Sequence, residues 1–280
     1  MPTEIASGAA DVRVFLDESS ALDIGAFLVD GVDLSPGEAV PSDGDQRIDH
    51  ALRGFLFTCG PDHIRHPEAV QEGETPLFPL HGSLCGTPVR STAATTNRCD
   101  AEIDIALADS GTARLDRRWA IDEETGEIAL LDRMTNTGKT GFPAMMMYHL
   151  NIGGRLLDAA TRIVSRTVAG GDMGWRFGEG ESAHFCLPAV ANDGWAEVCL
   201  GPLPALKGKS LIVRFSSTTL PYLQMWRCQR GGADVISIEP VSHRIAKRPL
   251  LAAAGEMPLL EPDASIDYAL SFRVGGLLYD

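Results

Sequence analysis

Three side chains that lie far apart in the sequence could take part in one acid–base reaction, namely His81, His149 and Glu239. Imidazole and carboxylate groups are the usual partners in proton transfer near pH 7, where one group accepts a proton while another donates one. The chain contains no Gly-x-Ser-x-Gly elbow and no Walker loop, so its motifs do not support nucleophilic ester cleavage or phosphoryl transfer. The three residues therefore favour general acid–base chemistry.

Each of these residues also has a purely structural explanation. His149 could be a core histidine whose ring bonds to a backbone carbonyl, because buried polar groups nearly always have a hydrogen-bond partner. His81 lies in a Leu-His-Gly triplet and could be a solvated loop residue, while Glu239 could be an exposed charge at the end of a strand. The functional interpretation depends on elements that bring the three side chains together.

The stretch 144–154, which contains His149, is the element most clearly defined by the sequence. It consists of Ala-Met-Met-Met-Tyr-His-Leu-Asn-Ile-Gly-Gly and contains no charged residue. Such a run is typical of a strand that is buried on both faces. Because side chains alternate along a strand, His149 should share a face with Met147 and Asn151 and point away from Tyr148.

Glu239 lies at the end of a second expected strand, residues 234–239. Two isoleucines alternate there with Val, Ser and Glu, so Glu239 should lie on the face opposite the isoleucines. The neighbouring segment 222–228 supplies Gln224, which could hydrogen-bond a polyol. It also supplies Trp226, which is either a core residue or an aromatic surface for a ligand.

The rest of the chain indicates an all-β protein. Segments of alternating polarity are separated by turn residues, and the clearest further strands are expected at 11–16, 52–59, 101–108, 112–121, 127–135, 197–200, 210–216 and 266–274. The stretch 33–46 is expected to be a loop, and Pro249 should break the one helix candidate, 244–254. No shift in composition marks a linker, so we expect one β-sandwich-like domain over residues 1–280.

Composition restricts the location and the partners. Of the 280 residues, 44% are hydrophobic and 22% are charged, as in soluble globular proteins. The formal net charge of −14 should repel nucleic-acid phosphates and anionic lipid, and no apolar run reaches the roughly 20 residues that cross a bilayer. We therefore expect no nucleic-acid partner and no membrane partner. Six scattered cysteines and the lack of an N-terminal signal pattern favour free thiols in the cytoplasm.

A metal site is an alternative use of the histidines. His63 and His66 are three residues apart, and with His81 and Glu239 they could serve a metal-dependent, cupin-like β-barrel. Cupins usually place two ligating histidines one residue apart, and the chain has no His-x-His. We therefore expect neither a metal nor another cofactor.

Four short motifs occur in an order that resembles proteins related to galactose mutarotase (aldose 1-epimerase), and most of all a less characterised branch of that superfamily. They are Phe-Pro-Leu-His-Gly at 78–82, Tyr-His-Leu-Asn-Ile-Gly at 148–153, Leu-Pro at 220–221 with Trp226, and Ile-Glu-Pro at 238–240. Each motif is only moderately specific, but the occurrence of all four in the order seen in that superfamily is much more specific than any one of them. The likeness extends from about Leu22 to about Gly275.

This resemblance implies a galactose mutarotase-like supersandwich, in which the concave face of a large antiparallel sheet holds a small-molecule sugar. In that family a glutamate removes the proton from the anomeric hydroxyl and a histidine protonates the ring oxygen, so the ring opens and recloses as the other anomer. By this likeness Glu239 is the base, His149 is the acid, and His81 is the second histidine, which hydrogen-bonds the sugar. Arg53 is the candidate for the family's N-terminal arginine.

The leading expectation is an aldose 1-epimerase-like isomerase that acts on a monosaccharide or a sugar derivative. Trp226 would cover an apolar sugar face, and polar side chains such as Gln224, Asn151 and Arg53 would bind hydroxyl groups.

Two departures from the family pattern motivate a second hypothesis. Ser83 stands where better-known enzymes have glycine, and Leu150 and Asn151 stand where they have aromatic residues. The alternative function is therefore a carbohydrate-binding or sensing domain that has kept the cleft but lost catalysis.

Overall fold

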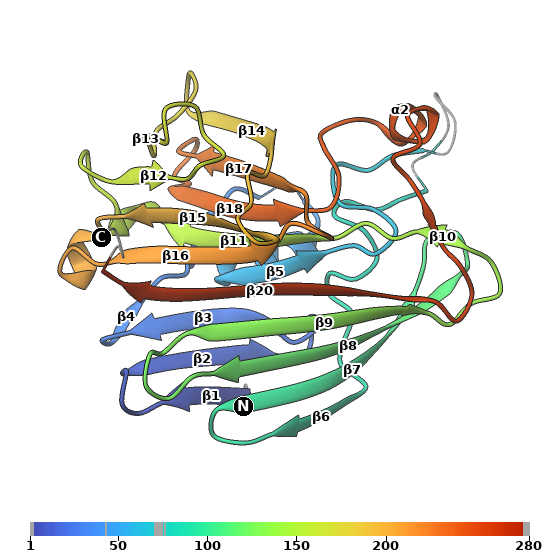
Figure 1. Cartoon of the computed structure of the whole chain (residues 1–280), viewed down its shortest axis with the longest axis horizontal. Helices are drawn as coiled ribbons and strands as arrows, with labels where there is room; N and C mark the ends of the chain where they lie inside the picture. The colour runs from blue at the N-terminus through green and yellow to red at the C-terminus, as the bar shows by residue number, and fades with distance from the viewer. Residues whose placement is uncertain (1–2, 43, 70–74, 76, 277–280) are drawn as a thin grey trace.

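The computed structural model of the chain describes residues 3–42, 44–69, 75 and 77–276. Within these residues the secondary structure is dominated by two antiparallel sheets of nine strands each, stacked one behind the other in Figure 1. The prediction of an all-β protein is confirmed. Part of the segment 61–82, residues 70–74 and 76, lies outside the described residues.

The first sheet contains the strands that carry the candidate residues. Its order is β1 (Thr3–Ser7), β2 (Val12–Asp17), β3 (Asp23–Val29), β5 (Leu56–Cys59), β11 (Met147–Gly153), β18 (Val235–Val241), β17 (Tyr222–Cys228) and β14 (Ser182–Pro188), and β4 (Val32–Asp33) pairs with β3. β11 lies near the middle, between β5 and β18, so it is covered on both edges.

The second sheet packs against the first. Its order is β13 (Asp172–Gly174), β12 (Arg162–Val164), β15 (Trp195–Gly201), β16 (Ser210–Ser216), β20 (Ser265–Gly275), β9 (Ile128–Asn136), β8 (Thr112–Ile121), β7 (Arg98–Ala106) and β6 (Ser91–Ala94). A short pair, β10 (Phe142–Pro143) and β19 (Leu259–Leu260), lies at one end. Two 3₁₀ turns span Gly154–Leu156 and Pro204–Leu206.

The burial patterns of the strands follow from the layers. β8 alternates between buried and less buried residues, because one face packs on the first sheet and the other faces solvent. Every residue of β11 is buried, as its uninterrupted apolar sequence predicts. Its inner face, with Tyr148 and Leu150, belongs to the core between the sheets, while Met147 belongs to a separate cluster on the outer face.

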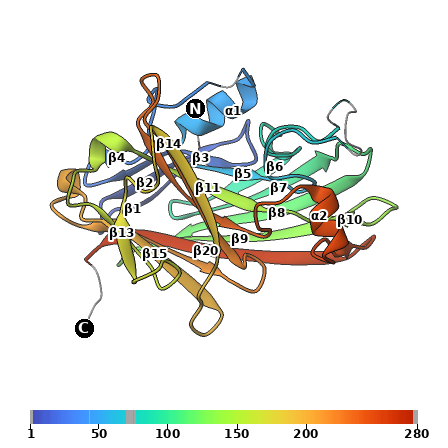
Figure 2. The same ribbon diagram turned by 90° about the horizontal axis from the view of Figure 1, so that it is seen from above.

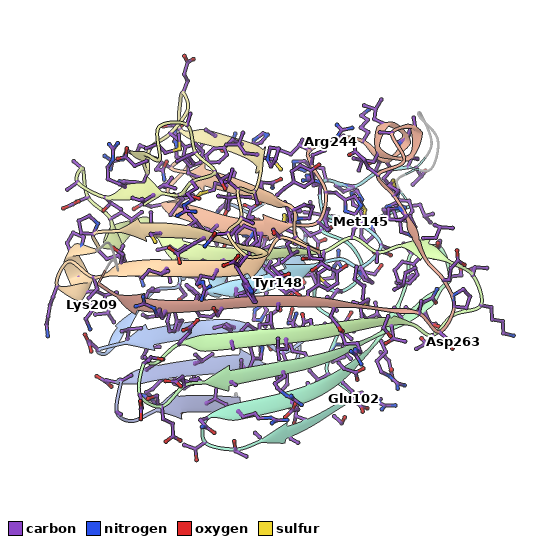
Figure 3. The ribbon with its side chains drawn as sticks, viewed as in Figure 1. Glu102, Met145, Tyr148, Lys209, Arg244 and Asp263 are labelled. Carbon is purple, nitrogen blue, oxygen red and sulfur yellow. The ribbon has the colours of Figure 1, made fainter. Side chains whose placement is uncertain are left out.

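A buried ionic network links the two sheets. Arg117 of β8 donates to Asp132 of β9 and crosses to Asp23 of β3 at 2.8 Å and to the hydroxyl of Thr58 at 2.8 Å. The hydroxyl of Tyr148, which is labelled in Figure 3, donates to Asp132 at 2.7 Å. Burial alone would lower the pKa of Arg117, but the charges of Asp132 and Asp23 outweigh it and raise that pKa. The network fixes the inner face of β11 directly beneath the candidate residue His149.

Removing one carboxylate of this network should be costly. We expect Asp132→Asn to lower the free energy of unfolding by about 3–5 kcal/mol, because it leaves the Arg117 charge buried with one carboxylate fewer. Urea denaturation measures this difference. Asp267→Asn is the matched control, because Asp267 pairs with Arg133 on the exposed face, where an ion pair contributes about 0–1 kcal/mol. Equal losses in the two variants would contradict the role given to the network.

Two short helices lie outside the sheets. Figure 2, seen from above, shows α1 (Gln46–Arg53) on the side of the first sheet that faces away from β20, and α2 (Arg248–Ala253) near β10. With described residues of the segment 61–82, such as Ile64 and Leu80, they cover part of the outer face of the first sheet, which explains why β11 is buried on both faces. Among the described helices, none is both long and apolar enough to span a membrane.

Both helices correct predictions made from the sequence. The expected strand 52–59 begins only at Leu56, because α1 extends to Arg53. Asp45 caps α1 by accepting a hydrogen bond from the backbone N–H of Arg47 at 3.0 Å. Pro249 does not break α2, because it lies in the first helical turn, where a backbone N–H has no partner within the helix.

Candidate active site

A cavity of about 430 Å³ opens on the outer face of the first sheet. Its floor is formed by β11, β18, β17 and β14, and its walls by α1 and by residues of the segment 61–82. It contains His81, His149, Gln224, Trp226 and Glu239, which are five of the seven residues that the sequence singles out.

Strand register brings the central residues together. β11 pairs with β18 so that Leu150 is opposite Ile238, which places His149 beside Glu239. β17 pairs with β18 so that Gln224 is directly opposite Glu239. Because side chains alternate, the polar residues all point outward into the cavity while their apolar neighbours point into the core.

The central feature of the site is the contact between His149 and Glu239. His149 Nε2 lies 3.2 Å from Glu239 Oε1, and the two side chains are only 5% and 1% exposed. A proton can pass between these two atoms or be exchanged by each of them with a molecule in the cavity. The arrangement is that of an acid and a base held side by side.

The orientation of the His149 ring is fixed from behind. Its Nδ1 lies 2.7 Å from Asn151 Oδ1, and Asn151 Nδ2 donates to the carbonyl of Gly54 at 3.2 Å. Because the amide nitrogen is used by Gly54, its oxygen must accept, and His149 Nδ1 therefore carries a hydrogen. Phe57 stacks on the same ring, with centroids 4.6 Å apart. Nε2 is consequently the nitrogen available for chemistry.

This arrangement changes the role expected for Asn151. Its side chain is fully buried behind His149, so it supports the imidazole and does not reach the cavity. The sequence pattern correctly places Asn151 and His149 on one face, but their hydrogen bond to each other depends on the side-chain geometry.

Two donors hold the carboxylate of Glu239. Ser237 Oγ donates to its Oε1, and Gln224 Nε2 donates to its Oε2. Ser237 lies two residues earlier on the same face of β18, and Gln224 lies on the neighbouring strand. The carboxylate therefore has a fixed orientation toward His149.

His81 enters the cavity from the segment 61–82. Its Nδ1 lies 3.2 Å from the carbonyl of Ile64 and 3.3 Å from the thiol of Cys59, and its ring centroid is 5.9 Å from that of His149. Burial and the neighbouring His149 lower the pKa of His81 to about 3. His81 is thus neutral near pH 7, with a hydrogen on Nδ1 and a lone pair on Nε2 that can accept a hydrogen bond from a ligand hydroxyl.

The glycine after His81 is required by the backbone. Gly82 has a φ of +82°, and a Cβ there would overlap the carbonyl oxygens of His63 and Gly60. The next residue, Ser83, hydrogen-bonds to Asp62 through its backbone N–H at 2.9 Å and through its hydroxyl. The Leu-His-Gly-Ser sequence therefore serves to hold the loop that presents His81.

Trp226 and Gln224 form the side of the cavity on β17. The Trp226 ring is partly buried, with its centroid 5.8 Å from that of His149 in an edge-to-face arrangement. It offers an apolar surface next to polar groups, which suits a sugar ring because a sugar has both apolar faces and hydroxyl edges.

Arg53 is not brought to this cavity. It lies at the exposed end of α1, where it pairs with Glu38 at 3.2 Å and lines a separate surface depression. Two other arginines line the cavity, the partly buried Arg65 and the exposed Arg230, and the sequence pattern singled out neither. Arg65 Nη2 donates to Gln224 Oε1 at 3.0 Å and to the carbonyl of His243 at 2.7 Å. The one feature of the sequence that could have drawn attention to Arg65 is its position between His63 and His66.

The histidines 63 and 66 do not form a pair of ligands. His63 Nε2 lies 2.6 Å from the carbonyl oxygen of His66, so its ring is turned toward the backbone. In the described part of the chain, no group of three or more His, Cys, Asp or Glu is placed to hold a metal ion.

The fold is shared with several solved structures. A proposed aldose 1-epimerase from Klebsiella pneumoniae superposes with a TM-score of 0.77 at 14% identity, over 95% of this chain and 77% of that one. A galactose mutarotase-like protein from Lactobacillus casei superposes with a TM-score of 0.71 at 12% identity, over 98% and 100% of the two chains. For an aldose epimerase homologue from C. elegans the TM-score is 0.68 at 13% identity, over 99% of both chains. These likenesses confirm the expected galactose mutarotase-like fold.

Sequence comparison identifies the family more directly. No curated protein matches the chain significantly. A family model described as a domain of unknown function (DUF4432) matches residues 5–172 and 175–274, which is nearly the whole chain. The chain therefore belongs to the DUF4432 family, and its fold is that of the galactose mutarotase-like proteins.

Proposed function

We propose that this protein is an isomerase of the aldose 1-epimerase type, which interconverts the anomers of a monosaccharide or sugar derivative. The observation that carries the proposal is the contact between His149 Nε2 and Glu239 Oε1 on the floor of an open cavity. Ring opening requires proton transfer at two oxygens bonded to one carbon, the anomeric hydroxyl and the ring oxygen. An acid and a base 3.2 Å apart are matched to that requirement.

In the proposed reaction Glu239 begins as a carboxylate and His149 carries hydrogen on both ring nitrogens. Glu239 takes the proton of the anomeric hydroxyl, and the electrons of that O–H bond form the carbonyl. The bond between the anomeric carbon and the ring oxygen breaks, and the ring oxygen takes the Nε2 proton of His149. Rotation within the open-chain aldehyde presents its other face, and the reverse steps return both protons and close the other anomer.

The remaining residues would orient the sugar. His81 is neutral near pH 7 and can accept a hydrogen bond from a hydroxyl, because its pKa is about 3. Trp226 would lie against an apolar face of the ring, and Gln224 would hold Glu239 toward the anomeric carbon. All six cysteines are free thiols, which fits the reducing environment of the cytoplasm that we propose as the location.

The competing proposal is a sugar-binding domain without catalysis. It was motivated by Ser83 and Leu150, but Ser83 is bonded to Asp62 in the loop and Leu150 is buried between the sheets. Neither departure touches the cavity, so neither removes a catalytic group. This favours the isomerase over the binding domain.

Anomer exchange measured by NMR on the unmodified protein, together with calorimetric titration of the same sugars, tests the proposal. We expect magnetisation exchange between the two anomers of at least one sugar at a rate well above that of the buffer. Saturable binding without any acceleration of exchange would support the binding domain instead.

Asn151 should act as a positioning residue for His149. We expect Asn151→Leu to slow exchange by about ten- to a hundredfold, because His149 Nδ1 loses its acceptor and the ring is no longer held with Nε2 toward Glu239. Asn151→Asp restores an acceptor at the same place and should recover most of the rate. A purely structural role predicts equal loss of activity and of thermal stability in both variants.

A further inference from the structure

The charges that line the cavity are mostly positive. Arg65 and Arg230 contribute two guanidinium groups, whereas Glu239 is the one carboxylate among the described residues of the lining. His66 and His184 add two imidazoles near the opening, where both are exposed. The net charge of the whole chain is −14, so the cavity has the opposite sign to the molecule around it. Such a local reversal is a feature of sites that attract an anion.

Arg65 is a cation that the described residues satisfy only in part. Its Nη2 is bonded to Gln224 and to the carbonyl of His243, but its Nε is buried and has no hydrogen-bond partner among the described residues. In the part of the chain that the structure describes, no carboxylate lies within 4.0 Å of its guanidinium. Burial lowers the pKa of Arg65, which means that the lost hydration is not fully replaced. An anion that bound here would offset that cost.

In the described part of the chain, the two fully buried arginines are satisfied within the protein. Arg117 is bonded to two carboxylates, those of Asp23 and Asp132. Arg227 uses its Nε and Nη2 to donate to backbone carbonyl groups. Arg65 is the exception among these three, and it is also the one that lines the cavity.

The position of Arg65 fits a substituent on the sugar. Gln224 spans the gap between Arg65 and Glu239, since its oxygen accepts from one and its nitrogen donates to the other. A group bound at Arg65 therefore lies about one amide side chain from the proposed base. The adjacent Cys186 thiol does not neutralise Arg65, because burial raises the pKa of that thiol. Exposed Arg230 follows the end of β17, where it can attract an anion toward the opening.

We propose that the substrate is a monosaccharide bearing an anionic group, a carboxylate, phosphate or sulfonate, which forms an ion pair with Arg65 while its anomeric carbon lies over Glu239 and His149. This inference rests on the proposed function where it places the anomeric carbon over Glu239 and His149. The selective binding of an anionic sugar at Arg65 stands independently of catalysis.

A matched sugar panel tests the inference. Glucose and galactose are compared with their uronic acids, their 6-phosphates and their 6-sulfonates, by NMR anomer exchange and by calorimetric binding. We expect at least one anionic class to be bound and exchanged about 10-fold or more better than its uncharged parent. Arg65→Gln should reduce that preference by about 10- to 100-fold, which is the usual effect of losing a hydrogen bond to a charged group. The exchange of the uncharged sugars should fall by a smaller factor, because Arg65 also donates to Gln224, which holds Glu239.

Two further variants separate charge from structure. Arg65→Lys keeps the charge but loses the planar fork, so it should retain part of the preference. Arg13→Gln, on the exposed part of β2 where Arg13 pairs with Glu4, should leave the preference unchanged. If Arg65→Gln lowered the exchange of charged and uncharged sugars by the same factor, the inference would be overturned.

The outcomes also distinguish this inference from the proposed function. Exchange of uncharged sugars without an anionic preference would contradict the inference and leave the isomerase intact. Preferential binding of an anionic sugar without exchange would contradict the isomerase and leave the inference intact. If no anionic sugar is either bound or exchanged, the inference is wrong.

Discussion

Glu239→Gln should lower the rate of catalysed anomer exchange by about 10²–10⁴-fold, because the amide cannot accept the proton of the anomeric hydroxyl. The substitution changes the shape of the side chain very little. Ser237 and Gln224 both donate to the carboxylate, and the Ser237 hydroxyl can rotate to accept from the new amide. We therefore expect the fold and the affinity for the sugar to change much less than the exchange rate.

The comparison requires a control with the same chemical change. Glu102→Gln provides it, because Glu102 lies on β7 of the second sheet and pairs with exposed Arg90. NMR exchange gives the rate, and calorimetry gives the affinity for the same sugar. If Glu239→Gln and Glu102→Gln exchanged anomers equally fast, Glu239 would not be the base.

His149→Gln should lower the exchange rate by a similar factor of about 10²–10⁴, because the ring oxygen loses its proton donor. The effect should be on the rate constant at saturating sugar more than on binding, since His149 acts on the ring oxygen as the bond breaks. The double variant with Glu239→Gln should be about as slow as the slower single variant, because residues that act in one step are not additive.

His50→Gln is the matched control for His149. His50 lies on the exposed face of α1 and pairs with Asp17 at 2.7 Å, away from the cavity. If the double variant slowed exchange by the product of the two single factors, His149 and Glu239 would act in separate steps. That result would contradict the paired mechanism.

The parts of the site that could be predicted from sequence are those determined by alternation along strands. The uninterrupted apolar sequence around His149 predicts a strand buried on both faces, and β11 is such a strand. The alternation of isoleucines with Ser237 and Glu239 predicts the face of β18 that points outward, and the isoleucines do lie in the core. These features are local, so a single sequence contains the information.

The parts that could not be predicted depend on contacts distant in sequence. Neither the register that puts Gln224 opposite Glu239 nor the hydrogen bond that His149 donates to Asn151 follows from spacing alone. Arg65 was missed because the segment around it has no regular secondary structure and therefore no periodicity that shows which way a side chain points. Arg53 was named only because the family resemblance implies an N-terminal arginine, and the expected strand 52–59 did not reveal that Arg53 lies at the end of the eight-residue helix α1.

The most direct test of the central claim is a crystal structure of the unmodified protein with its best-bound sugar. We predict that the anomeric hydroxyl lies within hydrogen-bond distance of the Glu239 carboxylate and that the ring oxygen lies within hydrogen-bond distance of His149 Nε2. A sugar whose anomeric carbon faced solvent, or whose ring oxygen lay on the side away from His149, would contradict it.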